Sequence, residues 1–106
     1  MENQNKIQEM QMLEQNFQNL LMQKQAFQIE FSETQSALKE IKNSKEDVFK
    51  IIGQLMIKTD KSKIEEELLN KEKILDLRIK TIEKQESPLT KQLEEMREEV
   101  IKSVKK

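Results

Sequence analysis

The chain has 106 residues, of which 37% are charged, 35% hydrophobic and 4% aromatic, with one Gly, one Pro and neither Cys nor His. This composition offers no thiolate nucleophile, imidazole base, zinc ligand set or disulfide, and a single Gly cannot build a phosphate-binding loop. The net charge of -1 argues against nucleic acid or an anionic membrane surface as a partner. We therefore expect one domain, spanning residues 1–106, with no cofactor, no metal and no catalytic activity.

The sequence gives no sign of membrane targeting. Residues 1–5 lack a basic region followed by an apolar one. The most apolar window, residues 51–57, is far shorter than the roughly 20 residues needed to span a bilayer. We expect a soluble, cytoplasmic protein.

Residues 1–44 are expected to form one long helix, closed by Asn43 and Ser44, because helix formers fill them and neither Gly nor Pro interrupts them. Apolar residues recur at steps of three and four, and only Lys24 and Thr34 break the series. Such a period, sustained over more than four heptads, is typical of a coiled coil. The series comprises Met10, Leu13, Phe17, Leu20, Lys24, Phe27, Phe31, Thr34, Leu38 and Ile41.

Residues 47–59 change character, because β-branched and aromatic residues replace the helix formers around Gly53. This pattern predicts a β-hairpin in which Gly53 supplies the positive φ of a tight turn. Alternation along the strands predicts that both faces are apolar. One face would carry Phe49, Ile51, Leu55 and Ile57, and the other Val48, Ile52 and Met56.

A lone two-stranded hairpin is marginal in water, and its edges invite another strand. We therefore expect several copies, or copies with a related chain, to join their hairpins into a closed or nearly closed sheet. The alternative is a hairpin that folds back onto its own helices as a local plug. The predicted oligomerisation residues are Val48, Phe49, Ile51, Ile52, Gly53, Leu55, Met56 and Ile57.

Residues 62–104 are expected to form a second long helix, opened by a capping box from Ser62 to Glu65. Pro88 predicts a kink, after which Ser87 could act as a new N-cap so that the helix resumes. The apolar period here comprises Leu68, Glu72, Leu75, Ile79, Ile82, Glu86, Leu89, Leu93, Met96, Val100 and Ser103.

The two apolar series match in an antiparallel register, because positions whose numbers add up to about 106 are apolar on both sides. The polar breaks also match, since Thr34 falls opposite Glu72, and Lys24 comes close enough to Glu86 for an ion pair. The predicted fold is mainly α with a small β-hairpin. It is a long antiparallel helical coiled coil whose central hairpin assembles into an intersubunit β-barrel.

The order of long helix, hairpin and long helix, with the motif Val48-Phe49-Lys50-x-x-Gly53-x-Leu55-x-Ile57-Lys58-Thr59, resembles the β-class subunit of prefoldin, most closely the archaeal form. The resemblance implies a hexamer of two α-class and four β-class subunits, joined by their hairpins in a double β-barrel. It also implies ATP-independent capture of unfolded proteins by the coiled-coil ends, and delivery to a group II chaperonin.

Apolar residues near both termini are the candidate client-binding residues, because the helical hairpin brings the termini to one end. Flexible Met side chains adapt to varied surfaces, and the coiled-coil seam does not use Met12, Met22 or Ile101. The rival interpretation is that five of the candidates simply form the seam, namely Met10, Leu13, Phe17, Met96 and Val100. The candidates are Met10, Met12, Leu13, Phe17, Met22, Met96, Val100, Ile101 and Val104.

The predicted function is an ATP-independent chaperone subunit that holds several weakly bound apolar segments at once. The alternative is a structural coiled-coil adaptor that binds one specific folded partner and protects no client. An enzyme is the third hypothesis, since the titratable groups are solvated carboxylates and amines with no pocket implied.

Overall fold

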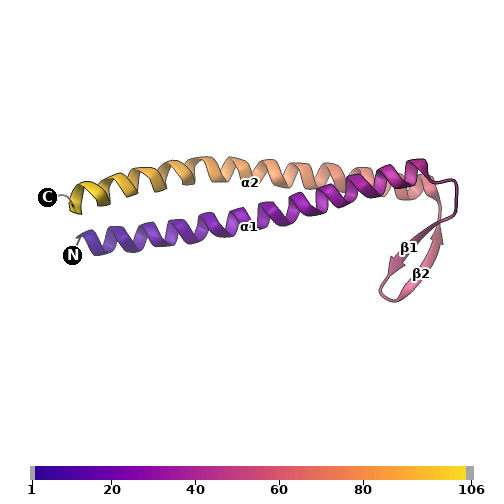
Figure 1. Cartoon of the computed structure of the whole chain (residues 1–106), viewed down its shortest axis with the longest axis horizontal. Coiled ribbons are helices and arrows are strands. Elements are labelled where there is room, and N and C mark those ends of the chain that lie inside the picture. Colours follow the sequence, from indigo (N-terminus) through magenta and orange to yellow (C-terminus); the bar gives the residue numbers. More distant parts are fainter. Residues whose placement is uncertain (1, 105–106) are drawn as a thin grey trace. The chain divides into compact units, whose positions relative to one another are not determined.

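The computed structural model describes residues 2–104, and the side chains of residues 4–104. In chain order the elements are α1 (Glu2–Asn43), β1 (Val48–Ile52), β2 (Leu55–Thr59) and α2 (Lys61–Val104) (Figure 1). The predicted fold class is confirmed, because two long helices flank a small antiparallel hairpin. The chain forms two compact units, which we call the hairpin unit (residues 27–78) and the terminal unit (residues 1–26 and 79–106). Met1, Lys105 and Lys106 lie outside the described residues.

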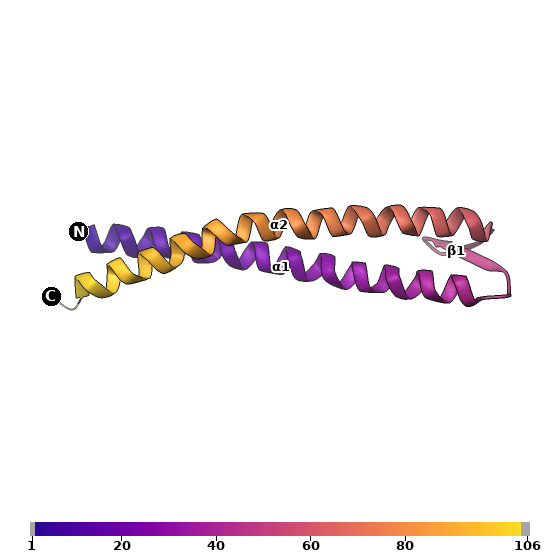
Figure 2. The same ribbon diagram turned by 90° about the horizontal axis from the view of Figure 1, so that it is seen from above.

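In the hairpin unit, residues 27–43 of α1 and residues 61–78 of α2 run antiparallel and side by side (Figure 2). Four side chains are buried at their interface: Thr34, Leu38, Ile64 and Leu75. The Thr34 hydroxyl donates to the Glu30 carbonyl at 2.8 Å, so α1 itself satisfies this polar break in the seam. The Arg78 guanidinium lies 5.6 Å from the centre of the Phe27 ring and covers the edge of this core.

The hairpin turns on Gly53 and Gln54, between paired Ile52 and Leu55. Gly53 has a φ of 61°, as the first residue of a type II′ turn requires. Directly opposed residues point to the same face of an antiparallel pair, so this register corrects the predicted grouping of side chains. One face carries Phe49, Ile51, Met56 and Lys58, and the other carries Val48, Lys50, Ile52, Leu55, Ile57 and Thr59.

The ends of the helices next to the hairpin are closed by local hydrogen bonds. The Ser44 amide donates to the Ile41 carbonyl at 3.2 Å, and Lys61 Nζ donates to the Ser44 carbonyl at 3.0 Å. Because α2 begins at Lys61, the N-cap is Asp60, whose carbonyl accepts the Ile64 amide at 3.1 Å. The predicted capping box at Ser62 is therefore wrong, since Ser62 already lies in the first helical turn.

In the terminal unit, residues 2–26 of α1 pack against residues 79–104 of α2 in antiparallel fashion. The buried side chains are Ile79, Ile82 and Leu93. Between Ile82 and Leu93 the interface contains the predicted ion pair, with Lys24 Nζ 3.2 Å from Glu86 Oε2. α2 continues through Pro88, so the helix does not end there, and Ser87 lies inside it rather than at an N-cap. A kink at Pro88 stays a prediction.

Candidate functional site

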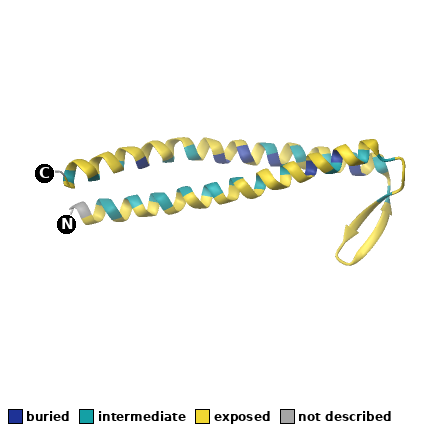
Figure 3. Ribbon diagram, in the orientation of Figure 1, coloured by how far each residue is buried: buried dark blue, intermediate teal, exposed yellow. Residues whose placement is uncertain are grey.

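The hairpin is the most exposed apolar element of the hairpin unit (Figure 3). Its apolar side chains are 44–70% exposed, except for half-buried Val48. These are Phe49, Ile51, Ile52, Leu55, Met56 and Ile57. The alternative of a hairpin plugged against its own helices is therefore wrong for this chain, because the helices leave both hairpin faces open to solvent.

One edge of the hairpin is nevertheless held near α2. Lys50 Nζ lies 3.2 Å from Glu67 Oε2, and Lys58 Nζ lies 3.4 Å from Asp47 Oδ2. β1 and the two helices line a shallow groove whose apolar side chains are Ala37, Ile41, Val48, Phe49, Ile51, Ile64 and Leu68. The Lys50–Glu67 pair joins the hairpin to α2, whereas the Lys58–Asp47 pair lies within the hairpin region, because Asp47 directly precedes β1. Both pairs are exposed and therefore weak, and they leave the apolar surface of the hairpin available.

The nine candidate client-binding residues fall into two groups in the terminal unit. Five are half-buried between the helices, as a seam predicts: Met10, Leu13, Phe17, Met96 and Val100. The other four are exposed, namely Met12 (67%), Met22 (65%), Ile101 (52%) and Val104 (73%). Apolar surface outside the seam is therefore present on both α1 and α2, and it includes the three residues that we expected to lie off the seam.

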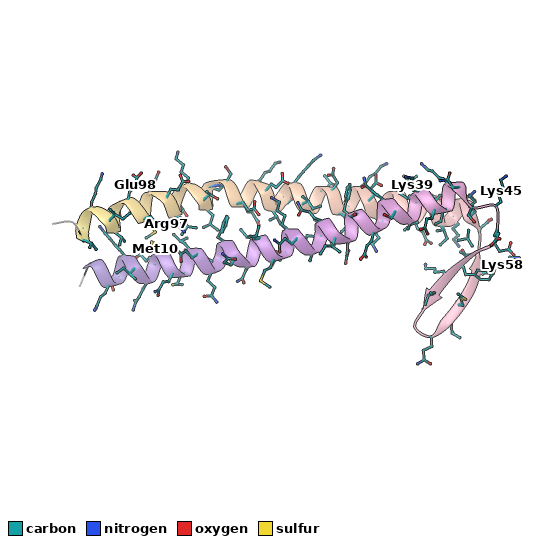
Figure 4. The ribbon with its side chains drawn as sticks, in the orientation of Figure 1. Met10, Lys39, Lys45, Lys58, Arg97 and Glu98 are labelled. Carbon is teal, nitrogen blue, oxygen red and sulfur yellow. The ribbon has the colours of Figure 1, made fainter. Side chains whose placement is uncertain are left out.

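The two sides of the terminal coiled coil differ in chemistry. On one side, which we call the methionine groove, both helices contribute to a shallow groove lined by Glu9, Met12, Leu13, Asn16, Gln92, Glu95, Met96 and Glu99. On the other side, which we call the bridged side, Arg97 Nη2 on α2 reaches Glu14 Oε1 on α1 at 3.3 Å. Figure 4 shows Arg97 between the two helices and Glu98 on the outer side of α2.

The acidic margin of the methionine groove is a feature that our sequence reasoning missed. The signal was present, because Glu9, Glu95 and Glu99 occupy positions next to seam residues Met10 and Met96 or one helical turn away. The apolar period identifies the seam but does not say which flanking residues of the two helices share a side. Only the register of the helix pair brings these carboxylates together.

Among the side chains of residues 4–104, no three or more potential metal ligands come together in one group. Neither α1 nor α2 contains a stretch apolar enough to cross a bilayer. The described residues present exposed apolar side chains, the free edges of a two-stranded sheet and surface charges.

Comparison with known proteins agrees with this arrangement. The prefoldin subunit family model matches residues 4–106. Prefoldin subunit beta of Saccharolobus islandicus is 36% identical over 92 residues, which cover 85% of this chain and 73% of that protein. Prefoldin subunit beta of Thermococcus onnurineus is 37% identical over 89 residues, which cover 82% and 77%.

A solved structure extends the comparison to the fold. The crystal structure of the prefoldin beta subunit from Thermococcus strain KS-1 matches with a TM-score of 0.85 and 31% identity, covering 96% of this chain and 91% of that one. The resemblance found in the hairpin motif is thus confirmed over nearly the whole chain. The chain belongs to the prefoldin subunit family, and within it to the β class.

Proposed function

We propose that this chain is a subunit of an ATP-independent chaperone that holds unfolded proteins and delivers them to a group II chaperonin. The observation that carries the proposal is the set of exposed apolar side chains outside the seam of the terminal unit. The absence of His and Cys from the sequence supports a binding role without catalysis. The proposed site of action is the cytoplasm, with no nucleic acid and no membrane as partner.

Assembly is proposed to occur through the hairpin. Six apolar side chains there are 44–70% exposed, and burial of the surface that remains exposed on each would contribute about 1–2 kcal/mol. A two-stranded sheet also has an outer edge on each strand that a neighbouring strand can extend. We propose that the chain joins other prefoldin subunits, in a hexamer of two α-class and four β-class subunits, through a shared β-barrel.

Capture is proposed to occur at the terminal unit. Methionine side chains are flexible and polarizable, so they fit apolar segments of many shapes. One coiled-coil end would hold a client segment only weakly. Once one end of an assembly is bound, however, the other ends are present near the client at a high effective concentration, so that they bind it more readily. Weak, multiple contacts of this kind allow a client to be held and later released.

The proposal is tested by replacing exposed apolar residues of the terminal unit with Ser. Met12→Ser combined with Ile101→Ser should reduce the suppression of aggregation of a chemically unfolded client, followed by light scattering. The matched control is Ile74→Ser with Leu77→Ser, because these residues are similarly exposed, at 50% and 64%, but belong to the hairpin unit.

The control variant should protect the client as well as the unchanged chain does. Equal protection by both variants would contradict the assignment of capture to the terminal unit. If the unchanged chain, assembled with an α-class subunit, protects no client, the chaperone proposal fails and the adaptor alternative gains support.

A further inference from the structure

The methionine groove has an apolar floor between two acidic walls. Leu13 and Met96 are half-buried on its floor, and Met12 beside them is 67% exposed. Glu9 stands on the α1 wall, while Glu95 and Glu99 stand on the α2 wall. A segment lying in the groove would therefore meet apolar surface below and carboxylates on both flanks.

These carboxylates are only partly neutralised by the protein itself. Lys6 Nζ lies 3.7 Å from Glu99 Oε2, with both side chains well exposed. Within residues 4–104, no cationic side chain forms an ion pair with Glu9 or Glu95. Two charges on opposite walls of the groove are thus left for a ligand.

The bridged side provides an internal contrast. There, Arg97 and Glu14 satisfy each other at 3.3 Å, and the other polar side chains are three amides, one hydroxyl and one carboxylate, that of Glu94. Among the described residues, the methionine groove thus carries two carboxylates without an ion pair, Glu9 and Glu95, and the bridged side carries one, Glu94. The excess lies on the side where Met12 is exposed.

We propose that the methionine groove selects, among unfolded clients, segments that combine apolar residues with Lys or Arg; this inference rests on the chaperone function proposed above. The aliphatic stems of Lys and Arg can lie along the methionines while their charged ends reach Glu9 and Glu95. A second copy of this chain is a poorer occupant, because it would present the same carboxylates to the groove. Because exposed ion pairs are weak and screened by salt, the selection is a preference that leaves binding reversible.

The experiment measures the affinity of the full-length chain for three fluorescent peptides by anisotropy at low ionic strength. The peptides share one pattern of Leu, Phe and Ser and differ only in having Lys, Gln or Glu at the intervening positions. We expect the Lys peptide to bind about threefold to tenfold more tightly than the Gln peptide, and the Glu peptide to bind most weakly. Added salt should reduce this preference.

Two double variants of equal net charge test whether the groove is responsible. Glu9→Gln with Glu95→Gln should abolish the preference for Lys and leave the affinity for the Gln peptide unchanged. Glu94→Gln with Glu98→Gln is the matched control, because Glu94 lines the bridged side and Glu98 lies on the outer side of α2. The control should retain the preference.

Equal affinities for the three peptides would overturn the inference and leave the chaperone proposal intact. An equal loss of preference in both double variants would also overturn it, since general charge and not the groove would then be responsible. Failure to bind any peptide, together with failure to protect a client, would instead contradict the proposed function. Self-association of the chain that Met12→Ser abolishes would identify a second copy as the occupant and would refute the inference.

Discussion

The hairpin and the terminal unit both expose apolar side chains, but they differ in whether their backbone hydrogen-bonding groups are free to bind a partner. The two strands pair only with each other, so each has an outer edge whose amides and carbonyls a further strand can bind. In the helices of the terminal unit, the backbone amides and carbonyls are hydrogen-bonded within each helix. A partner can therefore contact the exposed side chains there without pairing with the backbone. Similar exposure therefore has different consequences in the two regions.

Each region therefore suits a different kind of partner. A partner strand must match the hairpin in direction and register, which favours a specific and lasting contact with a folded subunit. Contact with Met12 or Met22 requires no register and no fixed geometry, which favours brief contact with many unfolded segments. The hairpin is thus suited to specific assembly, and the terminal unit to adaptable capture.

The largest effect is expected from Ile51→Asp combined with Ile57→Asp. The observed register places Ile51 and Ile57 on opposite faces of the hairpin, so the pair introduces a charge on each face. Burial of either carboxylate in a subunit interface is strongly unfavourable, and we expect the assembly to dissociate into smaller helical species. Light scattering of the chain reconstituted with an α-class subunit reports the mass.

The single variants then show which face of the hairpin the assembly buries more completely, and Gln54→Asp serves as a control in the exposed turn between the two strands. An unchanged mass for the double variant would show that the hairpin is not the site of assembly.

A second comparison concerns packing within the two helical interfaces. Leu75 of the hairpin unit is 2% exposed, and Leu75→Ala should lower the free energy of unfolding by about 2–5 kcal/mol. Met96 of the terminal unit is half-buried, so Met96→Ala should cost about 1 kcal/mol. Urea denaturation measures both values. Equal losses would mean that the terminal unit is packed as tightly as the hairpin unit, against the idea of an adaptable end.

A third comparison concerns the polar layer of the terminal unit. Lys24→Met leaves the Glu86 carboxylate, whose Oε1 already lacks a partner among the described residues, without its ammonium at 3.2 Å. We expect a loss of about 1–3 kcal/mol, because the Glu86 side chain is only 16% exposed.

Arg97→Met removes an ion pair whose side chains are 58% and 41% exposed, so it should change stability by no more than about 0.5 kcal/mol. Replacing both Lys24 and Glu86 with Leu should recover the stability that Lys24→Met alone loses. Equal effects of Lys24→Met and Arg97→Met would contradict a special role for the half-buried pair.

The helices and their pairing were predictable because a 3.5-residue period over many turns leaves few alternatives. Even the contact between Lys24 and Glu86 followed from matching polar interruptions in the two series. The Thr34 side chain was different: it lies buried as expected of the seam, but its hydroxyl bonds to Glu30 of its own helix. Periodicity places a polar residue in an interface but does not identify the atom to which its side chain is hydrogen-bonded.

The faces of the hairpin were not predictable from alternation alone. Leu55 and Met56 exchange faces according to how many residues form the turn, and the two-residue turn at Gly53 puts Leu55 beside Ile52. The N-cap is Asp60 and not the predicted Ser62, because several polar residues near the start of α2 can act as an N-cap and the sequence does not distinguish them. The acidic walls of the methionine groove depended on the helix register in the same way.

We infer that the hairpin mediates assembly and that the terminal unit mediates capture. Sedimentation velocity of a chain lacking residues 1–12 and 97–106, mixed with an α-class subunit and a fluorescent unfolded client, tests both parts in one run. We predict that the truncated chain sediments as the complete assembly while the client sediments separately. Co-sedimentation of the client with the truncated assembly, or loss of the assembly itself, would contradict the account.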